Sequence, residues 1–355
     1  MLDEATLHAA LPHALLTTDL EGMGERDEGK VRDLYRQSGR RLLVATDRIS
    51  AFDRVIGTIP FKGQVLNQLS AWWFEHTADL VQNHIIAVPD PNVTVAHEAV
   101  PLPVEVVVRG YLTGVTSTSL WMLYSQGVSK PYGLDLPPGL EKDARLPAPV
   151  ITPTTKAAKG EHDERLTSDE VVSRGLVAPA LWAEVQAAAL ALFARGTELA
   201  ARGGLILVDT KYEFGLVDGR LCVIDEIHTP DSSRYWEASA AEKESESDGL
   251  PRLSAAKADF SARARSAAPS APQPLTHGPA RPGEVRELDK EYVRKWLKSV
   301  GYSGDGPAPP LPDDVRVEAA RRYIQAYERL TGQTFIPGAQ PVRARMDTTL
   351  APWRA

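Results

Sequence analysis

The stretch GLILVDTKYEFGLVDGRLCVIDEIHTPDSSRYW, from Gly204 to Trp236, contains the features that decide the fold. Two runs rich in β-branched, aliphatic and aromatic residues, 205–214 and 221–227, predict two strands. Turn-forming residues occupy 217–219 between them. The two strands are therefore expected to form a β-hairpin.

Side chains along a strand point alternately to its two faces. One face of the first strand therefore carries Asp209, Lys211 and Glu213. The opposite face carries Val208, Thr210, Tyr212 and Phe214. We expect a charged row backed by a mostly apolar row that packs into the core. The alternative is a surface hairpin whose charged face is only solvated.

The length of the turn decides which residue of the second strand joins the charged row. With a three-residue turn, Asp225 pairs across from Lys211 and lies diagonal to Glu213. With a two-residue turn of Asp218 and Gly219, the register moves by one and Asp225 faces away from Glu213. Glu213 and Asp225 are candidate Mg²⁺ ligands, because Mg²⁺ is held by one or two carboxylates together with nucleotide phosphates.

The hairpin and its continuation, DEIHTPDSSRYW, resemble the signature of the phosphoribosylaminoimidazole-succinocarboxamide synthase (SAICAR synthetase) family of purine biosynthesis. Further blocks resemble the same family in the same order: GKVRDLY (29–35), TDRISAFD (46–53), IPFKGQVLNQLSAWWF (59–74), VVVRGYLTG (106–114), TPTTKAAKGEHDE (152–164) and LDKEYVRKWL (288–297). A chance match of so many ordered blocks is very improbable.

The resemblance implies an α+β fold of two subdomains, with mainly antiparallel sheets flanked by helices and an ATP and substrate cleft between them. A chain of 355 residues also exceeds the size at which one core usually keeps growing. The expected parts are an N-terminal sheet subdomain with a phosphate-binding loop (1–105), a larger α+β subdomain with the metal and substrate site (106–237 and 287–340), a flexible insertion (238–286) and a C-terminal tail (341–355). The insertion is predicted from its Ala, Ser, Glu, Arg and Pro content.

Apolar residues at helical spacing predict four helices, and a β-branched run predicts a strand that ends at Arg109. The second helix is expected to pack behind the hairpin. A proline-rich connector is expected after Pro89. The helices are predicted over 64–80, 178–203, 289–297 and 313–330, and the strand over 104–108.

The resemblance implies an ATP-dependent ligase. It would join L-aspartate to 5-amino-1-(5-phosphoribosyl)imidazole-4-carboxylate through an acyl phosphate, giving the succinocarboxamide, ADP and phosphate. Phosphorylation would convert a carboxylate, which is a poor acyl donor, into a reactive one. ATP would be a co-substrate and Mg²⁺ the cofactor.

Residues 29–33 place one glycine and two cations where a strand pair turns, which allows close approach to phosphate. The pattern is not the Walker sequence. Carried over from the family, the ATP-binding residues are Gly29, Lys30, Arg32, Glu213 and Asp225, and the last two would hold the metal. Lys211 and Asp209 would be the catalytic residues, with Asp209 at the imidazole amino group.

The resemblance also implies the contacts to the imidazole substrate. Arg109 and Arg234 would bind its phosphate or carboxylate by paired hydrogen bonds. Lys156 is expected to reach substrate or nucleotide from a long loop, 147–164, that is too polar for the core. The family has a hydroxyl where this chain has Val115. Its role falls to one of two residues, Ser117 or Ser119, between which the sequence does not choose.

Two other blocks are less specific. Asp47 and Asp53, among small polar residues, predict an Asx-type turn, which the resemblance sets beside the substrate pocket. His162 and Asp163 follow Lys156 within reach of ligand. The only cysteine, Cys222, is expected to fill the core.

Composition limits the function classes. The net charge of −7 gives no support for nucleic-acid binding, which would need a basic patch. No basic and apolar N-terminal signal pattern occurs, and no apolar stretch of about 18 residues that could span a membrane. We expect a cytoplasmic protein, with a monomer as the default state.

Two other functions stay open from the residues alone. A kinase that stops at phosphoryl transfer could use the same glycine-containing loop and acidic pair, although the HRD and DFG sequences of protein kinases are missing. A non-catalytic nucleotide-binding module is the other alternative. In such a module the acidic pair would be dispensable.

Overall fold

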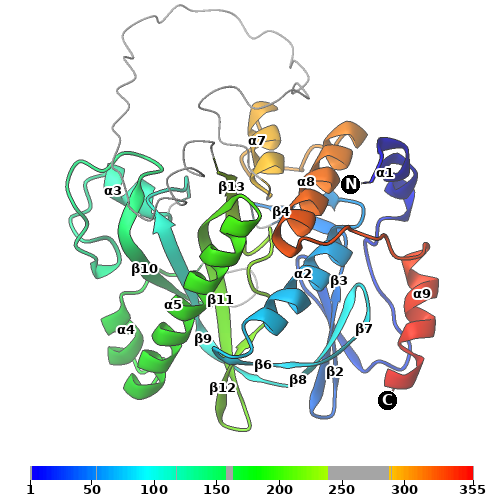
Figure 1. Ribbon diagram of the computed structural model, residues 1–355, viewed down its shortest axis with the longest axis horizontal. Helices are drawn as coiled ribbons and strands as arrows, with labels where there is room; N and C mark the ends of the chain where they lie inside the picture. Colours follow the sequence, from blue (N-terminus) through cyan, green and yellow to red (C-terminus); the bar gives the residue numbers. More distant parts are fainter. Residues whose placement is uncertain are drawn as a thin grey trace, which may run out of the picture.

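The strands of the chain form two main sheets with helices between and outside them (Figure 1). The computed structural model describes residues 2–52, 54–116, 118–156, 163–238, 288 and 290–354. The predicted insertion at 238–286 lies outside these residues except for residue 238. Among the described strands only one pairing, β12 with β6, is parallel. The α+β expectation with mainly antiparallel sheets is confirmed.

The N-terminal sheet has the strand order β1-β2-β3-β8-β7 and is antiparallel throughout. The expectation of a connector after Pro89 is wrong, because Val93–His97 form strand β8, in which Val93 and Val95 are fully buried. The strands are β1 (Glu25–Glu28), β2 (Arg32–Gln37), β3 (Arg40–Ala45), β7 (Ile85–Asp90) and β8 (Val93–His97). A separate hairpin joins β4 (Arg48–Ala51) to β5 (Arg54–Thr58).

The segment 341–355, expected to be a tail, forms helix α9 (Val342–Thr349) and a 3₁₀ turn, η3 (Ala351–Trp353). Val342, Met346 and Leu350 follow one another at four-residue intervals and are buried against the N-terminal sheet. Helical spacing puts these side chains on one face. The end of the chain therefore helps to cover this sheet, at the right of Figure 1.

The second sheet has the order β10-β9-β11-β12-β6, and β13 also pairs with β11. β11 is its centre: β9 runs along one edge, while β13 and then β12 share the other. The strands are β6 (Gln82–Asn83), β9 (Val100–Tyr111), β10 (Arg145–Thr155), β11 (Leu205–Val217), β12 (Arg220–Ile224) and β13 (Ser233–Glu237). The loop from β12 to β13 consequently passes beside the middle of β11.

The four predicted helices are present, and α5 packs against β11 as expected. The buried face of α5 includes Trp182, Val185 and Phe193. The helices are α1 (Glu4–Ala10), α2 (Lys62–His76), α3 (Leu120–Ser125), α4 (Ser168–Ser173), α5 (Pro179–Arg202), α7 (Glu291–Ser299) and α8 (Asp313–Thr331). Short 3₁₀ turns are η1 (Leu11–His13) and η2 (Pro131–Gly133).

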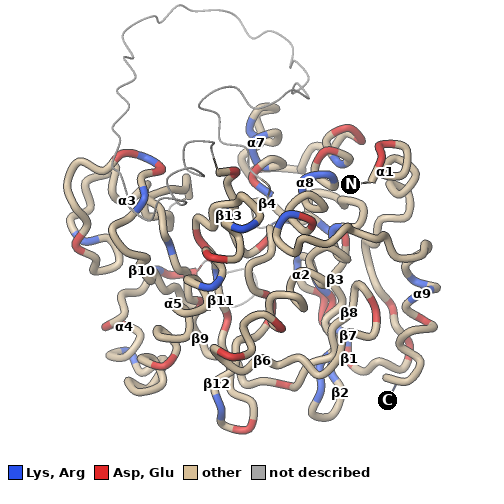
Figure 2. Tube along the Cα trace, in the orientation of Figure 1, with Lys and Arg blue, Asp and Glu red and all other residues tan. Residues whose placement is uncertain are grey.

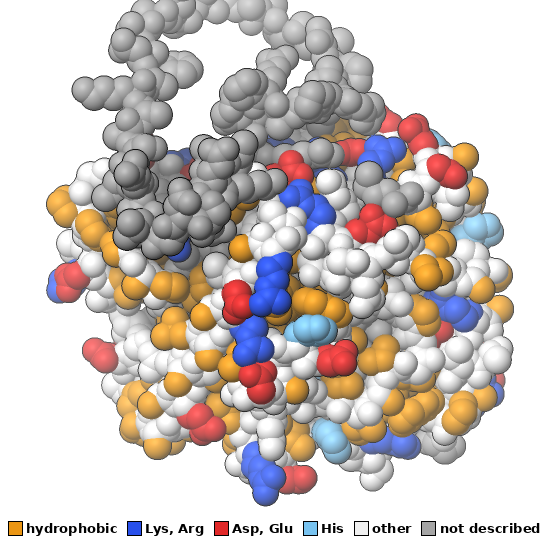
Figure 3. All heavy atoms as spheres, viewed as in Figure 1, with side chains coloured by type: hydrophobic (Ala, Val, Ile, Leu, Met, Phe, Trp, Pro, Cys, Tyr) orange, Lys and Arg blue, Asp and Glu red, His pale blue; other side chains and the backbone are white. Residues whose placement is uncertain are grey.

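The outer surface of the molecule mixes charges. On the face drawn in Figure 3, basic and acidic side chains lie next to one another with hydrophobic side chains between them. Two ion pairs involve α5, Arg195 with Asp79 and Arg202 with Glu198. Within the described ranges, no helix combines the length and the apolar character needed to cross a membrane.

Candidate active site

The alternation predicted for β11 is confirmed. Val208, Thr210, Tyr212 and Phe214 are at most 1% exposed and pack into the core. On the opposite face, Asp209 is paired with Arg109 of β9, and Glu213 with Glu105. Figure 2 shows basic and acidic residues side by side around β11. Asp209 is 5% exposed and Lys211 and Glu213 are half-buried, so the charged face is not simply a solvated surface.

The hairpin uses the two-residue turn, so the pairing of Asp225 across from Lys211 is wrong. Glu213 pairs with Ile224, and Asp218 and Gly219 form the turn with φ values of 50° and 75°. Left-handed conformations at both turn positions match the twist of the strands. Asp225 lies beyond the end of β12 and has φ 65°, so simple alternation no longer sets its direction.

Asp209 joins two arginines that sequence analysis assigned to the substrate. Its Oδ2 lies 3.4 Å from Nη1 of Arg109, and its Oδ1 accepts a hydrogen bond from Nε of Arg234 at 2.9 Å. Arg109 also donates from Nε to Oγ1 of Thr152 at 2.8 Å. Burial lowers the pKa of Arg109, while the Asp209 carboxylate opposes that change. The two guanidinium groups are thus held on one carboxylate.

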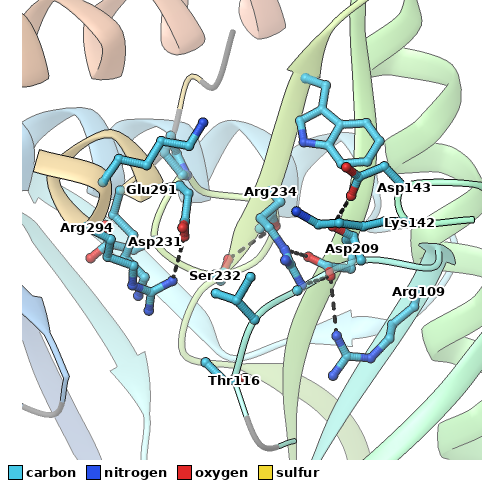
Figure 4. A pocket seen from close by; sticks show the side chains of 18 of the residues that line it. Arg109, Thr116, Lys142, Asp143, Asp209, Asp231, Ser232, Arg234, Glu291 and Arg294 are labelled. Atoms are coloured by element: carbon cyan, nitrogen blue, oxygen red, sulfur yellow. Dashed lines mark hydrogen bonds and ion pairs between the residues drawn. The ribbon is translucent and has the colours of Figure 1, made fainter. Parts of the chain in front are cut away.

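Asp209 and its two arginines line a cavity of about 650 Å³ (Figure 4). Arg109, Asp209 and Arg234 lie on one side of it, and Glu291, Arg294 and Asp231 on the other. The other labelled residues of the wall are Thr116, Lys142, Asp143 and Ser232. All of its lining residues lie beyond 105, so the N-terminal sheet contributes none of them.

The next two charged residues of β11 form a second cluster. Nζ of Lys211 lies 2.8 Å from Oε1 of Glu105 and 2.6 Å from Oε1 of Glu213. Lys156 forms an ion pair with the other oxygen of Glu213. Burial alone would raise the pKa of Glu213, but the two lysines outweigh it and lower that pKa. Burial raises the pKa of Glu105, with Lys211 acting against it.

The loop at residues 29–33 reaches the same region through Arg32. This guanidinium forms ion pairs with Asp225 and Glu226, which connect the N-terminal sheet to the loop after β12. Burial would lower its pKa, but the two carboxylates raise it. Lys30 is exposed. A side chain at Gly29 would meet the carbonyl oxygen of Arg32 at 2.8 Å, so glycine is needed there.

Sequence comparison connects the chain with a known family. A sequence model described as SAICAR synthetase matches residues 25–250. The chain belongs to the SAICAR synthetase family. It is 42% identical over 333 residues to the phosphoribosylaminoimidazole-succinocarboxamide synthase of Legionella pneumophila (strain Lens), with 93% of this chain and 95% of that one covered. It is 41% identical over 350 residues to the chloroplastic enzyme of Arabidopsis thaliana, covering 96% and 76%.

A solved structure of the same family shares the fold. The SAICAR synthase of Saccharomyces cerevisiae complexed with SAICAR superimposes with a TM-score of 0.71 at 28% identity, covering 91% of this chain and 100% of that one. The chain is therefore a SAICAR synthase, an ATP-using ligase of de novo purine biosynthesis. Membership of this family makes the kinase and the non-catalytic module unnecessary as explanations.

Ser119, one of the two serines expected to replace the family hydroxyl, does not line the cavity. Val115 and Thr116 line the cavity, whereas Ser119 is buried and donates from Oγ to the carbonyl oxygen of Thr116 at 2.6 Å. Gly114 has φ 100°, and a side chain there would meet Cβ of Ser119 at 2.5 Å. Ser119 thus shapes the loop. Ser117 lies outside the described residues.

Sequence analysis missed several charged residues of the cavity and of the cluster around Lys211. Asp231 lines the cavity and is held by Nζ of Lys62 at 2.7 Å and by the hydroxyl of Tyr323 at 2.6 Å. Burial would raise its pKa, but Lys62, Lys290 and the hydroxyl of Tyr323 together outweigh burial and lower it to about 2. Glu105 could have been found, because its period-2 spacing from Arg109 on one strand puts both on one face.

Arg48 holds the backbone of the loop at residues 29–33. Its buried guanidinium donates to the carbonyl oxygens of Gly29 and Lys30 and forms an ion pair with Asp33. Arg48 lies in the block that sequence analysis examined only for its aspartates. It therefore fixes the shape of a loop that the family resemblance assigns to phosphate.

Of the two aspartates in that block, Asp47 and Asp53, the structure describes only Asp47. Asp47 is buried and accepts hydrogen bonds from the backbone N–H groups of Leu15 and Gly63, at 2.7 and 2.8 Å. Its burial raises its pKa to about 6. Asp47 therefore connects parts of the fold and does not line the cavity. Asp53 and His162 lie outside the described residues, and Cys222 is buried as expected.

Proposed function

We propose that the reaction proceeds through an acyl phosphate at the junction of the two clusters on β11. The imidazole carboxylate oxygen would attack the γ-phosphorus of ATP, and ADP would leave. The amino nitrogen of L-aspartate would then attack the carbonyl carbon, forming the amide as the C–O bond breaks. Inorganic phosphate would depart with one oxygen of the original carboxylate. The ammonium group of L-aspartate would release two protons to solvent in the course of the reaction, and the amide would keep one N–H.

One observation carries this proposal. Asp209, which holds the two cavity arginines, and Lys211, which lies among carboxylates, are two residues apart on one face of one strand. That spacing separates their backbone positions by about 7 Å. A substrate carboxylate at the edge of the cavity would therefore meet a phosphoryl group near Lys211 without either ligand crossing the strand.

The nucleotide side would use the cluster that includes Arg32. Gly29 and Lys30 would approach the ATP phosphates from the loop above Arg48, with Arg32 beside them. Lys211 and Lys156 would turn from Glu213 toward the phosphates. Positive groups that face the transferred phosphoryl group stabilise the charge it spreads over its oxygens.

Mg²⁺ fits the donor chemistry of Glu213 and Asp225. Carboxylate oxygens are its preferred protein ligands, and one or two suffice when phosphates and water supply the others. Within the part of the chain that the structure describes, no group of three or more His, Cys, Asp or Glu side chains is arranged for a metal. When bound, Mg²⁺ would neutralise phosphate charge. Lys156 and Lys211 would give up their ion pairs with Glu213, and Arg32 its ion pair with Asp225, so that both carboxylates could bind Mg²⁺.

The imidazole side would use the cavity. Arg109 and Arg234 would bind the anionic groups of the imidazole nucleotide, and Asp209 would accept a hydrogen bond from its amino group. Neither step requires a nucleophilic side chain. We also propose that the protein acts as a monomer in the cytoplasm, as the sequence predicts; the chloroplastic name of the Arabidopsis relative shows that location varies in the family.

An isotope experiment tests the intermediate. The imidazole substrate would carry ¹⁸O in its carboxylate, and the phosphate released with ATP, Mg²⁺ and L-aspartate would be analysed by mass spectrometry. The proposal predicts one ¹⁸O atom in each phosphate, because the C–O bond to the carboxylate oxygen breaks. Phosphate without label would exclude the acyl phosphate.

A second experiment tests the metal ligands. Glu213→Gln keeps the size of the side chain and removes its charge, so half-maximal activity should require more Mg²⁺. Mg²⁺-dependent binding of a fluorescent ATP analogue gives a readout independent of turnover. Arg202→Gln, in an exposed ion pair on α5, is the control. An unchanged Mg²⁺ dependence in Glu213→Gln would remove Glu213 from the metal site.

A further inference from the structure

The loop from β12 to β13, residues 225–232, carries charged groups of the proposed metal site and of the cavity. Asp225 is its first residue, and Asp231 of the cavity wall lies near its end. Strand alternation does not set the direction of Asp225, because β12 ends at Ile224 and Asp225 has φ 65°. Contacts within and around the loop must therefore fix its position.

His228 lies near the middle of this loop and is fully buried. Its Nε2 is hydrogen-bonded to the hydroxyl of Tyr212 on β11. Its carbonyl oxygen accepts a hydrogen bond from the hydroxyl of Tyr235 on β13 at 2.7 Å. Tyr212 lies between Lys211 and Glu213 in the sequence, with its side chain on the opposite, apolar face of the strand. His228 therefore joins the loop to the strand that carries the charged row.

An imidazole at this position is costly in several ways. Within the described residues, Nδ1 of His228 is buried and has no hydrogen-bond partner, whereas most buried polar atoms have one. His228 also has φ 54°, in the left-handed region that residues other than glycine rarely adopt. Gly196 lies inside α5, where glycine is less favourable than alanine. A Cβ at Gly196 would meet Cε1 of the imidazole at 2.4 Å. Such departures concentrate at functional sites.

The imidazole acts through other residues and does not touch a ligand. It is absent from the cavity lining, and Trp73 of α2 meets its ring edge to face, with ring centroids 4.6 Å apart. Burial lowers the pKa of His228 to about 3, so the side chain is neutral near pH 7. A charged contact between His228 and a substrate is thereby excluded.

Thr229, next to His228, organises both ends of the loop. Its Oγ1 donates to Oε2 of Glu226 at 2.5 Å. Its carbonyl oxygen accepts hydrogen bonds from the backbone N–H groups of Ser232 and Ser233, at 3.1 and 2.8 Å. A displaced His228 would therefore displace the acidic start of the loop as well.

We propose that His228 is a positioning residue, which holds Asp225 in place for Mg²⁺ through its hydrogen bond to Tyr212. Because Tyr212 is the neighbour of Glu213 on β11, this hydrogen bond sets Asp225 relative to the other proposed metal ligand. The inference rests on the proposed function, in which Glu213 and Asp225 bind the metal.

The test uses Tyr212→Phe and His228→Leu in the full-length enzyme, with Mg²⁺-dependent binding of a fluorescent ATP analogue as the readout. Each variant removes the hydrogen bond, so half-maximal binding should require about 10-fold more Mg²⁺, as is usual when residues that orient metal ligands are changed. Partial unfolding would lower the amount of analogue bound but not the Mg²⁺ concentration at half-saturation. KM for the imidazole nucleotide should stay nearly unchanged, because Lys62 holds Asp231 independently.

The double variant Tyr212→Phe/His228→Leu separates positioning from stability. Each single variant leaves a buried polar group without its partner and should melt at a lower temperature, whereas the double variant removes both groups and should recover most of the difference. Its Mg²⁺ requirement should nevertheless stay about 10-fold raised, because the hydrogen bond from the loop to β11 is still missing. A Mg²⁺ requirement that recovers with the melting temperature would overturn the inference. Tyr212→Phe, the smaller change, decides if His228→Leu does not fold.

Asp225→Asn distinguishes failure of this inference from failure of the proposed function. It removes a proposed ligand directly, so its Mg²⁺ requirement should rise at least as far. An unchanged requirement in Asp225→Asn would refute the proposed metal site and the inference with it. A raised requirement there, with wild-type values in Tyr212→Phe and His228→Leu, would refute only the role of His228. Tyr124→Phe is the matched control, because its hydroxyl donates to the carbonyl oxygen of Pro137, outside the cavity lining.

Discussion

Lys211 forms ion pairs with both Glu105 and Glu213 and so offsets the repulsion between their carboxylates. Lys211→Met removes this positive charge. Glu105 and Glu213 are directly paired on neighbouring strands, where Cβ atoms are about 5 Å apart. Two unit charges at that distance repel by about 3 kcal/mol at an effective dielectric constant of about 20. The Lys211 side chain is 32% exposed, so solvent screens part of this repulsion. We expect the free energy of unfolding at pH 8 to fall by about 1–3 kcal/mol.

The loss should depend on pH. Burial raises the pKa of Glu105 above 4.5, and without Lys211 that pKa should rise further. A carboxyl whose pKa is raised by folding stabilises the folded state below its unfolded pKa. That contribution is lost as pH rises through the folded pKa. The deficit of Lys211→Met should therefore be smaller at pH 5 than at pH 8.

Urea denaturation of the wild type, Lys211→Met and Lys211→Met/Glu105→Gln at both pH values measures these differences. The double variant should recover most of the lost stability, because only one of the two opposed carboxylates remains. Arg202→Gln should match the wild type within about 0.5 kcal/mol. An equal loss at pH 5 and pH 8, or no recovery in the double variant, would refute the repulsion argument.

Three further changes test other parts of the site. Asp47→Asn removes a carboxyl whose pKa is raised from 3.8 to about 6, so its stability relative to the wild type should improve from pH 4 to pH 8 by roughly 3 kcal/mol in urea titrations. Arg32→Gln leaves Asp225 and Glu226 uncompensated and should cost about 3 kcal/mol of stability, with a raised KM for ATP. Asp209→Asn frees the two cavity arginines and should lower kcat/KM for the imidazole nucleotide about 10-fold to 100-fold in steady-state assays.

Periodicity and turn chemistry account for much of what the sequence could predict. The period-2 pattern of β11 was sufficient to predict which of its side chains are buried and which form the charged row, because side chains of a strand alternate between its two faces. Turn length was not decided in advance: Val217 could belong to the strand or to the turn, and only the pairing of Val217 with Arg220 excludes the longer turn. With the two-residue turn, Ile224 is the last residue of β12 that pairs with β11, so Asp225 lies outside the strand pairing.

Tertiary contacts account for what the sequence could not predict. Lys62 is fully buried, and nothing in its local sequence indicates that Asp231, far along the chain, provides its counter-charge. The helix α9 was missed because its apolar positions are few and its cover, the N-terminal sheet, is distant in sequence. The cationic side of α7 was visible as a charged helix, but only the folded chain shows that this side faces the cavity.

The central claim is that the charged face of β11 joins a metal-nucleotide site to the imidazole cavity. A crystal structure with a non-hydrolysable ATP analogue, Mg²⁺ and the imidazole carboxylate bound would test it most directly. We predict Mg²⁺ bound by Glu213 and Asp225, the γ-phosphate beside Lys211, and the imidazole carboxylate between Lys211 and Asp209. A nucleotide or metal bound away from this face, or an imidazole ligand outside the cavity, would contradict the account.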